Sequence, residues 1–285
     1  IVDTPAQCCF RSVFEPFKPP EMVRGKRVLV TGSSTGIGEQ IAYEFARMGA
    51  HLLLTARREK QLKEVRPQKK CLELGASSAR HVVSDMNNLT SAQNVIEEAR
   101  NKLGGLDYLV LNHVGGSGRF GPFQGDMAAV TSSMTVNFLS YVQLTVSAMT
   151  MLQESQGSII VISSLSGRIG APFTLSYNAA KFALEGFYSS LRRELRLREI
   201  SLSVTVAVLG YIDTDNALKS VGDKITMQAN PKEECAREVV RAGVLRHREV
   251  IYPYWGLKPL LLLKEWMPGL MERLLDKFFV LENIL

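Results

Sequence analysis

Short apolar runs alternate with longer amphipathic stretches from residue 27 onward. Such runs are typical of buried strands, and the segments between them are mostly long enough for a helix. A continuously apolar run such as residues 158–162 suits a strand that is covered on both faces of a parallel sheet. The alternation predicts seven strands, at residues 27–31, 51–55, 81–84, 107–111, 157–163, 201–209 and 249–252.

This pattern predicts an α/β fold of the Rossmann type: a doubly wound, seven-stranded parallel sheet with helices on both faces, over residues 25–254. The first twenty residues hold four of the eleven prolines and show no periodicity, so residues 1–24 are expected to form an extended arm. Residues 255–285 mix large apolar side chains with charges and are interrupted by Pro259 and Pro268. They predict an amphipathic C-terminal helical tail that serves as a lid, a dimer contact or a membrane contact.

The composition is that of a globular chain. Of 285 residues, 46% are hydrophobic and 22% are charged, which excludes a disordered, collagen-like or fibrous protein. No run reaches the roughly 18 apolar residues that span a bilayer, so we expect no transmembrane helix. The four cysteines lack a C-x-x-C pair, and His51, His81 and His247 lack ligand spacing, so we expect no metal site.

The excess of positive charge is local. The chain carries a formal net charge of +6, and residues 57–70 alone hold seven basic and two acidic residues, a net +5. The remainder of the chain is close to neutral, and it lacks basic stripes interleaved with aromatic residues. We therefore expect no nucleic-acid partner.

A glycine-rich turn joins the first predicted strand to a helix. Residues 31–38 read TGSSTGIG, and the helical stretch that follows ends near Met48. Glycines at this junction let the main chain approach a pyrophosphate, and the helix N-terminus offers free N–H groups and a positive dipole. The turn predicts a dinucleotide site formed by Gly32, Ser33, Ser34, Thr35, Gly36, Ile37 and Gly38; a tight turn without a ligand is the alternative.

The residues after the second strand indicate which dinucleotide binds. A carboxylate at this place would hold the ribose 2′-hydroxyl of NAD, whereas arginine suits the 2′-phosphate of NADP. The chain has Arg57 and Arg58 here, which favours NADP(H); the alternative is that both are solvated residues of the next helix. After the third strand, Asp85 and Met86 are candidates for contact with adenine.

A tyrosine and a lysine share one helix face farther along the chain. Tyr177 and Lys181 are four residues apart at the start of a stretch that runs through Leu195, and Ser164 ends the fifth strand. A free phenol has a pKa near 10, and a nearby ammonium lowers it. The spacing therefore predicts that Tyr177 transfers a proton with the help of Lys181.

Together these motifs resemble the short-chain dehydrogenase/reductase family across residues 25–252. Residues 110–113, 136–141, 180–184 and 208–210 are most similar to the branch of 11β-hydroxysteroid dehydrogenase type 1 and its type 1-like relatives. The resemblance implies that Tyr177 exchanges the proton and Ser164 binds the substrate oxygen. Lys181 would tune Tyr177 and hold the nicotinamide ribose, and Asn137 would hold a water in a proton relay. The same resemblance implies cofactor contacts at Tyr177, Lys181, Asn112, His113, Val114, Gly210, Ile212 and Thr214.

Four positions depart from the family pattern. Asn112-His113 replaces the usual Asn-Asn, and Leu209 precedes Gly210 where proline is usual. Thr35 stands where a basic residue is common in the turn, so Arg57 and Arg58 must carry more of the preference for NADP. Ala171 occupies the position of an expected steroid-contacting tyrosine. His113 is expected to hold the strand end in place rather than act as a base.

The resemblance implies an NADP(H)-dependent oxidoreductase that interconverts a ketone and a secondary alcohol on an apolar, steroid-like substrate. A reductase of another lipid-like carbonyl and a non-catalytic NADP-binding sensor or scaffold stay open as alternatives. The same resemblance implies a homodimer on the lumenal face of the endoplasmic reticulum membrane, held by an anchor upstream of Ile1, with secretion as the alternative. Asn88-Leu-Thr90 is a glycosylation acceptor motif in such a compartment.

Overall fold

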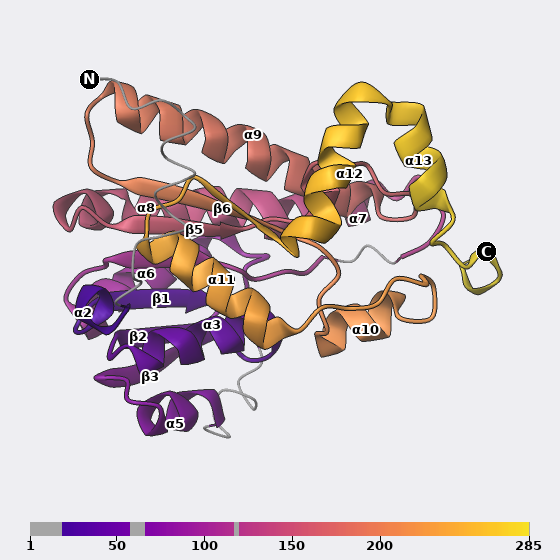
Figure 1. Ribbon diagram of the computed structural model, residues 1–285. Coiled ribbons are helices and arrows are strands. Elements are labelled where there is room, and N and C mark those ends of the chain that lie inside the picture. Colours follow the sequence, from indigo (N-terminus) through magenta and orange to yellow (C-terminus); the bar gives the residue numbers. More distant parts are fainter. Residues whose placement is uncertain (1–18, 58–65, 117–119, 285) are drawn as a thin grey trace.

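The computed structural model describes residues 19–57, 66–116 and 120–284 (Figure 1). Seven strands form one parallel sheet in the order β3-β2-β1-β4-β5-β6-β7, which confirms the predicted doubly wound fold. The order reverses between β1 and β4, the place where open sheets of this kind bind their ligands. The strands are β1 (Arg27–Thr31), β2 (His51–Ala56), β3 (Ser78–Val83), β4 (Tyr108–Leu111), β5 (Ser158–Ile162), β6 (Ser203–Leu209) and β7 (Glu249–Tyr252).

Helices cover both faces of the sheet. On one face Leu29 of β1 packs in a buried cluster with α6 (Leu89–Leu103), α8 (Ser140–Glu154) and α9 (Leu175–Leu197). On the other face Val28 and Val30 join a cluster with α3 (Gly36–Arg47), α5 (Arg66–Glu73) and α11 (Lys232–Val244). The alternation of Val28, Leu29 and Val30 between the two clusters follows from the two-residue period of a strand.

The remaining elements lie mainly beside the carboxyl ends of the strands. In Figure 1, α10, α12 and α13 gather at one end of the sheet, opposite the end where α2 lies. Within the residues that the structure describes, no helix is both long and apolar enough to cross a bilayer. These elements are α2 (Pro19–Val23), α7 (Met127–Met134), the π-helical turn η1 (Thr135–Leu139), the 3₁₀ turn η2 (Leu165–Gly167), α10 (Asp215–Val221), α12 (Tyr254–Trp266), α13 (Pro268–Asp276) and the 3₁₀ turn η3 (Leu281–Asn283).

Three expectations for local structure are corrected: the start of β3, the extended arm and the break at Pro259. Strand β3 begins at Ser78 rather than at residue 81, because this edge strand pairs with β2 through its main chain from His51↔Ser78 onward and needs no apolar run. The arm is not extended throughout: Pro19–Val23 is a helix, and proline is compatible with a helix's first turn. The preceding residues 1–18 lie outside the described residues.

The tail is helical as predicted, but Pro259 does not interrupt it. Helix α12 begins at Tyr254, so Pro259 falls in its second turn, where it removes one main-chain hydrogen bond without ending the helix. Pro268 does mark a boundary, because it is the first residue of α13.

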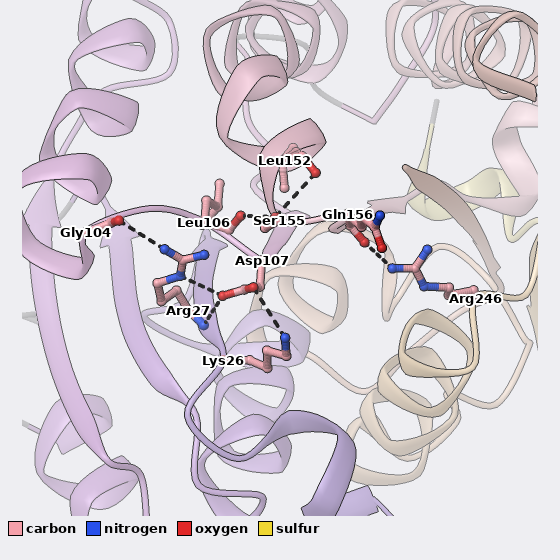
Figure 2. A network of polar contacts seen from close by, with 9 residues as sticks. All are labelled: Lys26, Arg27, Gly104, Leu106, Asp107, Leu152, Ser155, Gln156 and Arg246. Atoms are coloured by element: carbon pink, nitrogen blue, oxygen red, sulfur yellow. Dashed lines mark hydrogen bonds and ion pairs between the residues drawn. The ribbon is translucent and has the colours of Figure 1, made fainter. Parts of the chain in front are cut away.

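A buried carboxylate joins β1 to β4 at the amino end of the sheet (Figure 2). Asp107 Oδ2 accepts hydrogen bonds from the Arg27 main-chain N–H at 2.9 Å and from Arg27 Nε at 2.7 Å. Lys26 Nζ lies 3.6 Å from Asp107 Oδ1, and Arg27 Nη1 donates to the Gly104 carbonyl at 3.0 Å. Burial raises the pKa of Asp107, but the hydrogen bonds and charge of Arg27 outweigh it and leave this pKa below its usual value.

Replacing Asp107 with asparagine should lower the free energy of unfolding by about 2 kcal/mol at pH 7, because a charge-assisted pair is lost in a buried position. The folded-state pKa is depressed, so this contribution is present above the unfolded value of about 3.9 and is lost as pH falls through the folded value. Denaturant unfolding from pH 7 to pH 3 should show the two proteins converge at low pH. Glu194→Gln, which breaks an exposed pair with Arg198, serves as control and should change stability far less. A difference that stays constant down to pH 3 would contradict the prediction.

Candidate functional site

The glycine turn after β1 closes tightly against the loop after β4. Gly32 and Gly36 have φ values of 65° and 68°, where a residue with a Cβ is strained. A Cβ on Gly38 would lie 2.3 Å from Asn112 Nδ2 and 2.4 Å from the carbonyl oxygen of Gly32. Residues larger than glycine at these positions would therefore push the turn away from the strand ends.

The serine and threonine residues of the turn have different tasks. Ser33 is buried, and its N–H and hydroxyl donate to the Thr55 carbonyl at 3.1 and 3.4 Å, which anchors the turn to β2. Thr35 precedes α3 in an extended conformation and makes no side-chain capping hydrogen bond. Ser34 and Ile37 are partly exposed beside it. The uncapped N–H groups and the dipole of α3 thus favour an anion such as a pyrophosphate.

Thr31 is the centre of a hydrogen-bond network at the switch between β1 and β4. Its hydroxyl oxygen accepts from the N–H groups of Asn112 at 2.9 Å and His113 at 3.3 Å, and lies 2.9 Å from His113 Nδ1. Asn112 Nδ2 in turn donates to the carbonyls of Thr31 and Gly32, both at 3.1 Å. Asn112 therefore fixes the glycine turn with its side chain.

His113 holds structure together, as the sequence predicted. Its Nε2 lies 2.7 Å from Ser140 Oγ and 3.1 Å from the Val136 carbonyl, while Ser140 itself donates to that carbonyl at 2.7 Å. This pattern assigns the ring proton to Nε2 and leaves Nδ1 as an acceptor, which shares the single proton of the Thr31 hydroxyl with the Val110 carbonyl, 3.1 Å from the same oxygen. Burial lowers the pKa of His113 to about 3, and the charge of Lys181 adds to the effect, so the ring is neutral at physiological pH.

Arg57 lies near the loop after β4. A Cβ on Gly115 would lie 3.5 Å from Arg57 Nη2, so the guanidinium reaches from the end of β2 across to this loop. The Arg57 residue is exposed, which leaves donors available for a phosphate. Arg58, the second arginine predicted to bind NADP, lies outside the described residues.

The other predicted contacts with the adenosine half differ in accessibility. Asp85 is exposed, and its Oδ1 accepts from the Asn87 N–H at 3.0 Å. Met86 is buried in the core, so its side chain offers adenine little surface. Val114 is half exposed and presents an apolar side chain directly after His113.

The loop after β6 reaches back to the glycine turn. A Cβ on Gly36 would lie 3.0 Å from Thr214 Cγ2, so the two segments are in close contact. Thr214 also caps α10 by accepting from the Ala217 N–H at 3.3 Å, and Ile212 is buried. Gly210 bonds to the Tyr252 carbonyl at 2.9 Å. The structure thus brings Thr214 to the predicted cofactor cradle, while Gly210 packs against Pro253 and Leu257 and Ile212 pairs with Asn230.

Ser164, Tyr177 and Lys181 come together as predicted. Ser164 follows β5 and accepts from the Ser166 N–H at 3.2 Å, and its hydroxyl is close enough to the Tyr177 phenol to lower the pKa of that group. The Lys181 ammonium lies 5.6 Å from the centroid of the Tyr177 ring and donates to the Ile162 carbonyl at 2.8 Å. A hydroxyl, a phenol and a buried cation thus meet where β5 and α9 approach one another.

Close packing of η2 against α9 sets the distance between Ser164 and the other two residues. A Cβ on Gly167 would lie 2.8 Å from the Lys181 carbonyl oxygen, so only glycine lets the turn lie directly on the helix main chain. The position of Ser164 relative to Lys181 is therefore fixed by backbone contact rather than by long side chains.

The expected lowering of the tyrosine pKa is corrected. Burial raises the pKa of Tyr177 to about 12, and the hydrogen bond from Ser164 opposes this only in part. Burial also lowers the pKa of Lys181 to about 7, with Glu185 opposing the change. The prediction failed because it counted the charge of Lys181 and left out the desolvation of both groups.

Asn137 is fully engaged by the protein. Its Nδ2 donates to the carbonyls of Gly115 at 2.7 Å and Ser133 at 2.9 Å, and its Oδ1 accepts from the Gly115 N–H at 3.1 Å. The π-helical turn Thr135–Leu139 places this side chain against the loop after β4. The amide therefore locks that loop, and the expected relay water stays a prediction.

Two features near Lys181 were missed from the sequence. The Tyr141 ring centroid lies 5.2 Å from Lys181 Nζ, and the Tyr141 hydroxyl donates to the His113 carbonyl at 2.7 Å. Glu185 Oε2 lies 2.8 Å from Nη2 of Arg168, the residue directly after η2. Tyr141 and Glu185 each lie four residues after a predicted site residue, and this spacing was the available signal.

Two further motifs are placed by the structure. Asn88 is exposed and caps α6, accepting from the N–H groups of Thr90 at 2.9 Å and Ser91 at 3.2 Å. Among the residues described, no group of three or more histidine, cysteine, aspartate or glutamate side chains is arranged to hold a metal ion.

Comparison with known proteins agrees with this geometry. Residues 26–224 match the family described as short chain dehydrogenase. The hydroxysteroid 11-beta-dehydrogenase 1-like protein B of Xenopus laevis is 69% identical over 264 residues, or 93% of this chain and 90% of the relative. Two solved structures share the fold, each covering 80% or more of this chain and 96% or more of its own. One is a metagenomic short-chain oxidoreductase in complex with NADP (TM-score 0.68, 24% identity, covering 81% and 97%). The other is an NADH-dependent reductase responsible for alginate metabolism (TM-score 0.70, 23% identity, covering 80% and 96%).

Proposed function

Because this chain belongs to the short-chain dehydrogenase/reductase family, whose members are oxidoreductases that use a nicotinamide cofactor, we propose that it interconverts a ketone and a secondary alcohol with NADP(H). The proposed substrate is apolar and steroid-like, as the name of the 69% identical Xenopus laevis relative indicates for that protein. The observation that carries the proposal is the meeting of Ser164, Tyr177 and Lys181 beside a glycine cradle.

The cradle fits a dinucleotide. The glycine turn, the uncapped start of α3 and Thr214 would hold the pyrophosphate and nicotinamide half, and Val114 and Asp85 would face the adenosine half. Arg57 carries the preference for NADP, because an exposed guanidinium binds a 2′-phosphate and gains little from a 2′-hydroxyl. When bound, the cofactor supplies or accepts the hydride.

The protein's own residues handle the proton and the oxygen. During ketone reduction the Tyr177 hydroxyl gives its proton to the substrate oxygen, and the Ser164 hydroxyl donates a hydrogen bond to the same oxygen. Ser164 can do this because the Ser166 N–H already occupies one of its lone pairs and orients it. Lys181 sits beside the Tyr177 ring and stabilises the phenolate left by the transfer.

A reductase of another lipid-like carbonyl is a second candidate. Ala171 stands where the family resemblance led us to expect a tyrosine that contacts steroid. Ala171 uses its carbonyl to accept from Asn178 Nδ2 at 2.5 Å, and its methyl group cannot replace a phenolic hydrogen bond. This observation favours substrates held by shape and apolar contact.

We propose that the tail closes one side of the substrate site. Phe279 packs between Phe120 and Phe173, with ring centroids 6.3 Å and 5.7 Å away, and the latter two rings are 5.9 Å apart. Main-chain bonds secure it: the Thr226 N–H donates to the Phe278 carbonyl at 2.8 Å, and the Val280 N–H donates to the Lys224 carbonyl at 2.9 Å. Phe173 lies four residues before Tyr177, in the turn that leads into α9, and this nearness along the chain supports the proposal.

The outer surface of the tail supports a further proposal, contact with a membrane surface. Trp255 and Trp266 of α12 are each 85% exposed, and Leu262 between them is 54% exposed. Spacings of seven and eleven residues put these three side chains on one stripe of the helix. Tryptophan is favoured at the boundary between lipid and water.

The remaining proposals concern assembly and location. A homodimer is proposed from the family resemblance, and half-exposed apolar side chains on α8 and α9, Val146 and Phe182 among them, offer it surface. We also propose the lumenal face of the endoplasmic reticulum membrane, with secretion as the alternative. The exposed Asn88 of a glycosylation motif fits either place.

Replacing Tyr177 with phenylalanine should reduce NADPH-dependent ketone reduction by about 10²- to 10⁴-fold, because the proton donor is removed. NADPH affinity, measured by fluorescence titration, should stay within about twofold of the parent. A screen of hydroxysteroids, retinoids and small carbonyls supplies the substrate. Turnover that survives in the variant would defeat the mechanism, and a parent inactive on every apolar carbonyl or alcohol would favour a sensor.

The cofactor preference has its own test. Arg57→Ala should weaken NADPH binding about tenfold or more, because a charge-assisted contact with the 2′-phosphate is lost. NADH binding should stay nearly unchanged. Equilibrium titration of both cofactors against parent and variant measures this. Arg80→Ala, which removes an exposed arginine bonded to the Lys102 carbonyl, is the matched control. A parent that prefers NADH would overturn the assignment.

Two tail variants separate the lid from the membrane contact. Phe279→Ala should raise the KM for a polycyclic ketone about tenfold and leave NADPH affinity unchanged, with exposed Leu281→Ala as control. The double variant Trp255→Ser, Trp266→Ser should lower co-sedimentation with phosphatidylcholine vesicles and leave the KM unchanged. A normal KM in Phe279→Ala argues against the lid, and normal sedimentation of the double variant argues against the membrane contact.

A further inference from the structure

A cluster of charges lies directly behind the catalytic residues. Arg168 follows η2, the turn that begins after Ser164, and its guanidinium contacts the carboxylates of Glu185 on α9 and Glu249 on β7. The Arg168 carbonyl accepts from Lys264 Nζ of α12 at 2.7 Å. The cluster therefore connects the serine turn with the helix that carries Tyr177 and Lys181.

Glu185 occupies a special place in this cluster. It lies one helical turn after Lys181 and two turns after Tyr177, so the three residues share one face of α9. Its side chain is only 13% exposed, and its Oε1 is buried without a hydrogen-bond partner in the described part of the chain. Arg168, which pairs with its other oxygen, is shared with Glu249. One carboxylate oxygen of Glu185 is thus left without a donor in the described part of the chain, one helical turn from the lysine.

Lys181 needs such a charge. It is 2% exposed, and its ammonium donates to one carbonyl, that of Ile162. Apart from Glu185, the titratable groups that face it within the described residues are uncharged at neutral pH: Tyr177 on its own helix, Tyr141 on α8, and His113 after β4. Burial of this kind strongly disfavours an ammonium ion.

We propose that Glu185 is a positioning residue that raises the share of Lys181 in its ammonium form and, through Arg168, links that charge to the turn bearing Ser164. The lowered pKa of Lys181, about 7, agrees with this geometry, since burial lowers it and the charge of Glu185 opposes the shift. Arg192, one further charged residue on α9, faces Glu185 and is held by the carbonyls of Val204 and Arg248. The proposal rests on the proposed function, because Lys181 matters through Tyr177.

Removing the charge of Glu185 has a predictable sign. In Glu185→Gln the ammonium of Lys181 loses its opposing charge, so its pKa falls and the lysine becomes neutral at lower pH. The alkaline limb of the pH profile of kcat/KM for ketone reduction should move down by about one pH unit in the variant. At pH values above the alkaline limbs of both parent and variant, kcat/KM should therefore be about tenfold lower in the variant. Glu185→Asp keeps a carboxylate and should return the alkaline limb most of the way to the parent's pH. The matched control is Glu249→Gln, which breaks the other ion pair of Arg168 and should leave the limb at the parent's pH.

A second readout does not depend on turnover. NMR titration of protein labelled with ¹⁵N-lysine, with the Nζ signal of residue 181 assigned through Lys181→Arg, measures the pKa directly in each variant. A parent without turnover would defeat the proposed function while this titration still decides the role of Glu185. An unchanged Lys181 pKa in Glu185→Gln, or an equal shift in Glu249→Gln, would overturn the inference. A shift confined to Glu185→Gln and reversed by Glu185→Asp supports it.

Discussion

The hydrogen bonds around the Thr31 hydroxyl are the interaction on which the site depends. They join the end of β1 to the loop after β4, at the one place where the strand order reverses. From there His113 extends the network to the π-helical turn, and Asn137 returns it to Gly115. The glycine turn and the start of α8 are consequently one hydrogen-bonded unit, built around the neutral, buried imidazole of His113.

Much of the fold followed from the sequence because strands buried on both faces must be apolar throughout. The boundaries of β1 and β7 were predicted to the residue, whereas β3 was placed too late because an edge strand is held by its main chain. The glycine turn and the Tyr177–Lys181 pair were visible because both are local in sequence. Glu185 and Arg168 were not, since their contact joins segments whose approach only the packing of η2 on α9 defines.

Desolvation and charge oppose each other at Tyr177 and Lys181. Burial raises the pKa of Tyr177 and lowers that of Lys181, so each group is driven toward its neutral form. A sequence motif shows that a phenol and an amine are neighbours, but it does not show how much water surrounds them. The ionic state of the pair is therefore set by the surroundings, of which the carboxylate one helical turn farther along α9 is a part.

Asp107 and its partners Lys26 and Arg27 lie at the amino ends of β1 and β4. The predicted site lies at the carboxyl ends of the strands. The two regions share strands β1 and β4 but no side chain. Substitutions at well-separated places usually add their effects on stability independently. Stabilising substitutions at the amino end of the sheet would therefore raise the free energy of unfolding without altering the predicted site. The added stability could then offset destabilising substitutions at the carboxyl end that laboratory evolution toward a new substrate would require.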